Sequence, residues 1–204
     1  MLVAVATVVS AAMALAACQG GSGDAGSSAS STTAPTGVPP TGAPAPDTCA
    51  GFRGATTVLR SVGATAPAVL VDAEAGAVGC LDQVTFTFRS LGDGTPPGYV
   101  VQYQDPAQDP FLDGDPPGPI SLPGNAFLVV KMAPALSVDP FVEGMPSTYD
   151  GNLLLEYGEH RHLQIVRKLP DGDNTVVWVI GLDSVRPFRV DRAEDPTRVT
   201  VYIG

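Results

Sequence analysis

Two histidines and two nearby glutamates form the first group of side chains that could do chemistry. His160 and His162 are the only histidines, and their spacing on a strand would point both rings to the same face. With a carboxylate such as Glu156 or Glu159, the pair could hold a metal ion. The alternative, which the sequence favours, is two exposed histidines at the start of a strand. We therefore predict no metal site and no cofactor.

A second group consists of aspartates in two short segments. Asp109, Asp113 and Asp115 lie in one segment, and Asp171 and Asp173 lie in another. Carboxylate oxygens are ligands that Ca²⁺ prefers, but the residue order of the helix-flanked calcium loop is absent. Aspartates also favour turns, and this is the favoured interpretation. Asp109, Asp113 and Asp115 are kept as candidate binding residues.

The sequence contains no recognisable catalytic nucleophile. Neither a Gly-x-Ser-x-Gly nor a Ser-x-x-Lys motif occurs. Paired carboxylates could serve glycoside hydrolysis, but that depends on their separation in space, which a sequence does not give. The absence of motifs predicts that the protein is not an enzyme.

Aromatic rings could contribute to binding by stacking on sugars. Trp178, Tyr99, Tyr103 and Tyr157 would do so if they were exposed. Their alternating positions in predicted strands favour core packing for most of them. Trp178 and Tyr149 are kept as candidate binding residues.

The three cysteines fall into two groups, a single cysteine near the N terminus and a pair in the domain. Cys49 and Cys80 are an even pair if Cys18 is modified separately, and in an oxidising compartment we expect them to form a disulfide. Two free thiols or a metal-binding pair are the disfavoured alternatives, because no further ligand lies at a useful spacing.

The first 17 residues contain no charge, no glycine and no proline, and they lead into Leu15-Ala16-Ala17-Cys18. The segment is short for a transmembrane helix, which needs about 20 residues, and it is typical of a signal peptide. The tetrad resembles the lipobox of bacterial lipoproteins. By that resemblance Cys18 receives a diacylglyceryl group, with fatty acids such as palmitate, and anchors the chain to the outer face of the cell membrane. A plain secretory signal that happens to contain Cys18 is the open alternative.

Composition divides the rest of the chain into a tether and one domain. Residues 18–47 are almost entirely Gly, Ser, Ala, Thr and Pro, with Val38 as the one larger aliphatic residue. Such a segment cannot bury enough apolar surface to fold, so we predict a disordered tether. Residues 48–204 have the length of a single domain with a substantial core.

Charge is distributed unevenly over the domain. Residues 72–159 carry thirteen acidic side chains against only Arg89 and Lys131, whereas the remainder is nearly balanced, and the net charge is −10. No basic patch could neutralise phosphates, so the sequence excludes nucleic-acid binding. The acidic half is interpreted as a solvated surface.

Alternation of apolar and polar residues is the dominant pattern of the domain. Residues 175–182 are apolar on both faces, which predicts a central strand. Residues 53–62 are the best, though weak, helix candidate, and two long connections span 105–125 and 133–150. The pattern predicts an all-β sandwich or partly open barrel of about eight strands. These strands are expected at 68–72, 83–89, 99–104, 126–132, 162–167, 175–182, 188–190 and 198–203.

Five motifs follow one another along the domain: Gly79 to Phe88, Pro97-Gly98-Tyr99 to Tyr103, Tyr149-Asp150-Gly151, Trp178 to Leu182 with Arg186 to Val190, and Asp195-Pro196 to Val201. In this order they resemble the motifs of the AMIN-like domains of lipoproteins from high-GC Gram-positive bacteria. Gln83 stands where the family has Arg, and Thr200 interrupts the last apolar run, but both positions are expected to face solvent. The resemblance covers residues 68–204 and implies a β-sandwich.

The resemblance also implies a function, though no functional residues. AMIN domains proper target cell-wall amidases and secretins to the wall, apparently by contacting peptidoglycan. We therefore expect a lipid-anchored, non-catalytic module that binds peptidoglycan through the two long acidic loops. The alternative is a protein-interaction or assembly lipoprotein of an envelope machine, in which residues 198–203 would offer a sheet edge to a partner strand.

Overall fold

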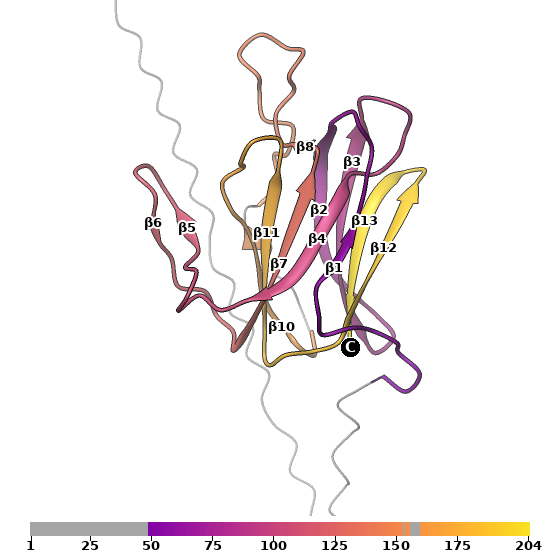
Figure 1. Cartoon of the computed structure of the whole chain (residues 1–204), viewed down its shortest axis with the longest axis vertical. Helices are drawn as coiled ribbons and strands as arrows, with labels where there is room; N and C mark the ends of the chain where they lie inside the picture. Colours follow the sequence, from indigo (N-terminus) through magenta and orange to yellow (C-terminus); the bar gives the residue numbers. More distant parts are fainter. Residues whose placement is uncertain (1–48, 153, 156–159) are drawn as a thin grey trace, which may run out of the picture. The chain divides into compact units, whose positions relative to one another are not determined.

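Strands account for all the regular secondary structure of the described residues, which are 49–152, 154–155 and 160–204 of a computed structural model (Figure 1). These residues all belong to one compact unit, Ala43–Gly204. The predicted signal peptide, Cys18 and the tether lie outside the described residues. Within the described part of the chain, no helix has the length and hydropathy needed to cross a bilayer.

The eight predicted strands all form, and each has at least six residues. Their burial follows the alternation of the sequence: in β3, every second residue from Asp82 to Phe88 is buried. The all-β prediction is therefore confirmed. The strands are β2 (Ala68–Val78), β3 (Leu81–Ser90), β4 (Gly98–Gln104), β7 (Ala126–Ala133), β10 (Leu163–Lys168), β11 (Val176–Leu182), β12 (Phe188–Glu194) and β13 (Thr197–Ile203).

Short strands complete two larger sheets and one small one. The six-stranded sheet has the order β1-β4-β7-β11-β10-β9, and the five-stranded sheet has the order β12-β13-β3-β2-β8. The third sheet is the hairpin β5–β6. The short strands are β1 (Leu59–Ser61), β5 (Leu112–Asp113), β6 (Gly118–Pro119), β8 (Ala135–Leu136) and β9 (Leu154–Leu155).

The last strand is not a sheet edge. β13 pairs with β12 on one side and with β3 on the other, so the prediction that residues 198–203 offer a free edge is wrong. β12 is the outer strand instead, and it carries charges of both signs from Arg189 to Glu194. Charged side chains on an outer strand discourage pairing with another chain.

The weak helix prediction for residues 53–62 is also wrong. Ala55 exchanges two backbone hydrogen bonds of 2.8 Å with Phe188 at the start of β12, and β1 pairs with β4. The Arg192 guanidinium also donates to the carbonyl of Val62 at 2.8 Å. The segment thus covers one edge of each large sheet, because backbone groups on both edges need partners.

The core lies between the two large sheets, around Trp178. Its ring is fully buried and lies 5.4 Å, centroid to centroid, from the ring of Phe86 on the facing sheet. The ring of Tyr149 meets Trp178 edge-on at 5.7 Å. Burying each such side chain stabilises the fold by about 1.5–3 kcal/mol, so this contact between the layers defines the sandwich.

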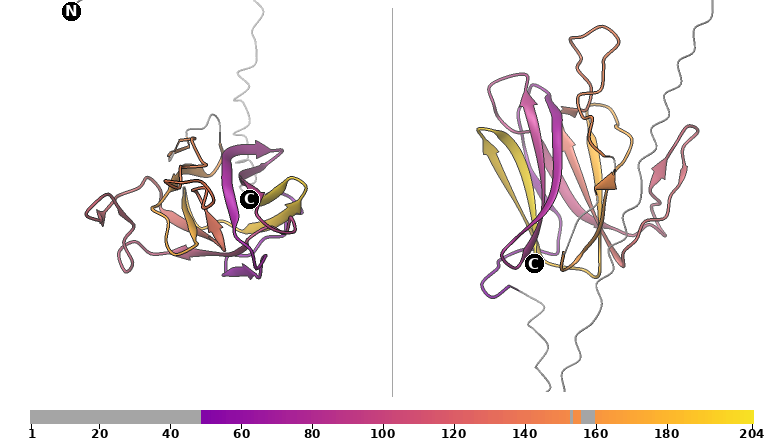
Figure 2. Two further views of the ribbon diagram at one scale, coloured as in Figure 1. Left: turned by 90° about the horizontal axis from the view of Figure 1, so that it is seen from above. Right: turned by 180° about the vertical axis from the view of Figure 1, so that it is seen from behind.

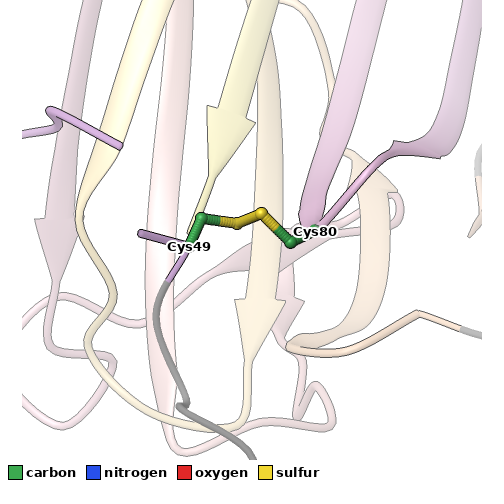
Figure 3. Close-up of a disulfide and its surroundings, with 2 residues drawn as sticks. All are labelled: Cys49 and Cys80. Atoms are coloured by element: carbon green, nitrogen blue, oxygen red, sulfur yellow. A yellow bond between two sulfur atoms is a disulfide. The ribbon is translucent and has the colours of Figure 1, made fainter. Parts of the chain in front are cut away.

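The predicted disulfide between Cys49 and Cys80 is confirmed (Figure 3). It joins the first described residue to the two-residue turn between β2 and β3, where Gly79 adopts a positive φ of 62°. The two cysteines are 31 residues apart. Closing a loop of that length stabilises the folded state by about 3–4 kcal/mol, by restricting the unfolded chain.

Candidate functional site

The outer face of the six-stranded sheet is apolar at its centre and is covered by the connection between β4 and β7. Val129 and Val179 point outward from β7 and β11, yet they are 2% and 0% exposed. Phe111 lies over them, with its ring 5.5 Å from that of Phe127. Figure 2 shows the hairpin β5–β6 of this connection standing off the side of the sandwich. We call residues 105–125 the arm.

Polar contacts hold the arm at both ends and in the middle. Its first part is fixed by a hydrogen bond of 2.8 Å from the Gln104 amide to the carbonyl of Asp109. In the hairpin, Asp113 forms an ion pair with Arg167 of β10. The hydrogen bond from the Arg167 guanidinium keeps the pKa of Asp113 below its ordinary value.

A glycine of the sheet makes room for the returning end of the arm. A Cβ at Gly181 would lie 2.2 Å from the carbonyl oxygen of Pro123, so a larger residue there would displace the arm. Asn125 then donates a backbone hydrogen bond of 2.8 Å to Leu182. The arm is therefore built onto the sheet rather than being a loose loop.

A groove of about 330 Å³ separates the arm from the sheet. Its floor is formed by outward-facing residues of β7 and β11, and its walls come from the arm and from the turn after β10. A neighbouring hollow of about 390 Å³ shares Lys131 and extends to residues 61–64. The groove is lined by Gln104, Asp109, Pro110, Phe111, Leu112, Pro117, Val129, Lys131, Leu169, Pro170 and Val177.

Lys131 is the cation of this groove. In the sheet it lies between Val100 of β4 and Val177 of β11, so valines flank it on both sides. Its side chain is exposed, and among the described residues it has neither an ion pair nor a side-chain hydrogen bond. Asp109, which is exposed, lines the same groove. The groove therefore combines an aliphatic floor with two opposite charges.

The structure separates the three candidate aspartates by role. Asp109 lines the groove, Asp113 holds the arm, and Asp115 is exposed in the turn of the hairpin. Asp113 also accepts a hydrogen bond of 2.8 Å from the backbone of Gly114, as expected for turn formation. Within the described residues, no group of three or more His, Cys, Asp or Glu side chains could hold a metal ion.

Trp178 and Tyr149 lie in the core, which does not fit a role in surface binding. Trp178 is 0% exposed and Tyr149 is 5% exposed. The Tyr149 ring lies over Gly151, where a Cβ would come within 2.6 Å of it. The spacing of Tyr149 and Gly151 is thus explained by packing.

The prediction of two exposed histidines is wrong, because the side chains of His160 and His162 are only 6% and 8% exposed. The two histidines contact different acids. His160 Nδ1 is 3.5 Å from Asp82 Oδ1, whereas His162 Nδ1 is 3.2 Å from Asp183 Oδ2. Asp82 is fully buried and accepts backbone hydrogen bonds from Arg161, His162 and Leu163. The carboxylate therefore organises the chain that enters β10. Glu156 and Glu159 lie outside the described residues.

The sequence reasoning missed Phe111, Lys131 and Arg167. One signal was available for Lys131, because it is the only charge in the apolar run from Ala126 to Ala133. A lone charge in such a strand marks a place where one face of the sheet reaches solvent.

Comparison with known proteins identifies one relationship. The family model of the AMIN-like domain matches residues 68–204. The matched region includes the arm and every residue that lines the groove. No curated protein and no solved structure matches the chain.

Asp183 is expected to make the stability of the domain dependent on acidic pH. Burial raises the pKa of this carboxyl, but hydrogen bonds from Arg186 and His162 outweigh that effect and lower the pKa to about 2. Because the folded-state pKa lies below the unfolded value, the stabilisation is fully present above about pH 4 and is lost as the pH falls toward 2. Urea unfolding between pH 2 and 6 should show that Asp183→Asn removes about 1–2 kcal/mol at pH 6 and much less at pH 2.

The matched control is Asp191→Asn, which removes a carboxylate from a half-exposed ion pair with Arg189. This substitution should change stability little at any pH, because exposed ion pairs contribute little. An equal loss for both variants, or a constant loss for Asp183→Asn across the pH range, would contradict the assignment.

Proposed function

The chain belongs to the AMIN-like domain family over residues 68–204, and from that premise we propose that it is a non-catalytic envelope protein that binds peptidoglycan. AMIN-like domains are generally binding domains without catalytic activity. The observation that carries the proposal is the groove between the arm and the six-stranded sheet, which is a preformed concave site on rigid strands.

The proposal includes attachment to the membrane. It is supported by the sequence Leu15-Ala16-Ala17-Cys18 and by the composition of residues 18–47. A lipid on Cys18 would hold the chain at the outer face of the cell membrane. A tether of this length reaches about 30 Å on average, which would let the domain meet material beyond the lipid headgroups.

Binding to peptidoglycan is tested by co-sedimentation with purified sacculi, using the full chain with Cys18→Ser so that no lipid is attached. We expect saturable binding that survives high salt, because most of the groove surface is apolar. Leu112→Asp places a carboxylate on the wall of the groove, at a side chain that is 46% exposed, and should weaken binding by about tenfold or more.

Val78→Asp is the matched control for that variant. Val78 is 49% exposed at the end of β2 and does not line the groove. Equal binding by both variants would place the contact elsewhere on the domain. Absence of sedimentation by the parent chain at low and high salt would refute the proposed function.

Anchoring is tested separately by membrane fractionation of cells that produce the chain. The parent chain should label with radioactive palmitate and partition into the detergent phase. Cys18→Ser should abolish both properties, whereas Cys49→Ser with Cys80→Ser should preserve them. Loss of the label only in the second variant would contradict lipidation at Cys18.

A second candidate function, assembly with an envelope protein, is favoured by one exposed apolar tip. Phe141, Val142 and Met145 are 78%, 49% and 59% exposed. Asp139 fixes the base of the loop, since its backbone donates to Pro146 at 2.9 Å and its carboxylate pairs with Arg89 at 2.7 Å. An aromatic side chain held in this way is typical of an anchor that enters a partner's pocket.

Photo-crosslinking in cells tests the tip. A photoreactive amino acid at Val142 should give one adduct of defined mass, and Phe141→Ser should abolish it because the neighbouring anchor is lost. Val185, which is 59% exposed and lies outside this loop, is the control position. Identical adducts from both positions, or none from Val142, would count against a partner at the tip.

A further inference from the structure

We propose that the groove binds the peptide of peptidoglycan rather than its glycan, and that Lys131 binds a carboxylate of that peptide. This inference rests on the proposed function and names the part of the wall that the site takes. It also assigns a role to Lys131 as the residue that orients the bound peptide.

The side chains of the groove are poorly suited to a glycan. Phe111 is the one aromatic residue among those that line it, and it is only 2% exposed because it packs onto the sheet. Tyr99 of the adjoining hollow is partly buried and packs against the core. Protein sites for sugars commonly offer an exposed ring and several polar groups, whereas this groove offers mainly prolines, leucines and valines. The amide nitrogen of Gln104 donates a hydrogen bond to the arm.

The charges of the groove suit a peptide with ionised ends. Lys131 is one of two basic residues in the stretch 72–159, which has thirteen acidic residues. Five cations of the described residues form ion pairs, such as Arg89 with Asp139. The ammonium of Lys131, like the guanidinium of Arg198, has no such partner within the described residues, and Lys131 is the one basic residue that lines the groove. A cation left unpaired beside an aliphatic floor is complementary to an anionic group on an apolar ligand.

Asp109 fixes the direction in which such a ligand would lie. It lines the same groove as Lys131 and would repel a carboxylate but attract an ammonium group. Wall peptides carry free carboxylates and, where they are not cross-linked, the amino group of a diamino acid. A peptide with its carboxylate at Lys131 and its amino group toward Asp109 therefore satisfies both charges, and its aliphatic side chains meet Val177 and Leu169.

The adjoining hollow explains how a longer peptide could be accommodated. Lys131 lines both cavities, so its ammonium is reached from either side. An extended chain could therefore continue past Lys131 toward Thr175 and the segment 61–64. A site closed at Lys131 would admit only a terminal carboxylate, whereas this one also fits a carboxylate within the peptide.

The test measures binding of the full chain with Cys18→Ser to three probes. These are intact sacculi, glycan strands stripped of peptide by an amidase, and the soluble peptides released by the same digestion. We expect binding to sacculi and to the released peptides, and none to the stripped glycan. Lys131→Met, which keeps the aliphatic stem, should weaken both interactions by about fivefold, the value of one exposed ion pair.

Arg198→Met is the matched control. Arg198 is an exposed cation on β13 of the other sheet and has no ion pair among the described residues. It should leave binding unchanged, because it removes the same net charge at a distance from the groove. Blocking the carboxylates of the released peptides as amides should reproduce the loss seen with Lys131→Met.

Each outcome separates this inference from the function on which it rests. Binding to stripped glycan as tight as to sacculi, or an unchanged affinity of Lys131→Met, would overturn the inference and leave peptidoglycan binding intact. Equal binding of an unrelated peptide of ordinary L-residues would overturn the assignment to wall peptides. No binding to sacculi at all would refute the proposed function itself.

Discussion

The structure depends on one constraint: strand β11 is apolar on both of its faces and must be covered on both. Trp178 and Ile180 point inward and are fully buried against the five-stranded sheet. Val177 and Val179 point outward, where a two-layer sandwich has no further layer. Exposing such a strand to water would cost about 25 cal/mol for each Å² of apolar surface. The arm supplies the missing cover, so the arm is a consequence of the sequence of β11.

Incomplete cover then creates the groove. The arm is a single hairpin with its connections, and it contacts the sheet mainly through Phe111 and through the ion pair of Asp113 with Arg167. It buries Val129 and Val179 but leaves Val177 only partly covered beside Lys131. The family model spans strands β2 to β13, the arm and the glycine at 181 that admits the arm.

Much of the fold could be predicted from the sequence because alternation is local. The eight long strands and the disulfide follow from the spacing of apolar residues and from the cysteine count. Sheet order could not be predicted, since β3 pairs with β13, as in the contact of Thr85 with Thr200, 115 residues apart. The spacing of apolar residues in the segment 53–62 weakly suits a helix. The segment instead pairs with the edges of two sheets, which the sequence does not reveal.

The candidate site was less predictable for the same reason. Alternation shows which residues share a face, but not which face is covered, so the burial of Tyr149 and Trp178 became clear only with both sheets in place. Asp113 could be predicted as a turn former, whereas its ion pair with Arg167 joins residues 54 positions apart. Phe111 lies in a loop rich in proline and aspartate. A single aromatic residue in such a loop does not reveal which surface it packs against.

The position of the groove is compatible with attachment at the start of the domain. Cys49 is joined to the turn before β3, and Phe52 lies against Gly204, so the chain enters the domain beside its C terminus (Figure 1). The exposed loop between β8 and β9 lies at the opposite end in Figure 1, and the groove lies between the arm and the outer face of the six-stranded sheet. One exposed ion pair and a short aliphatic floor give only weak affinity by themselves. The proposed lipid on Cys18 would raise the local concentration of the domain beside the wall, and so the occupancy of the groove, above what the unanchored chain reaches in the sedimentation test.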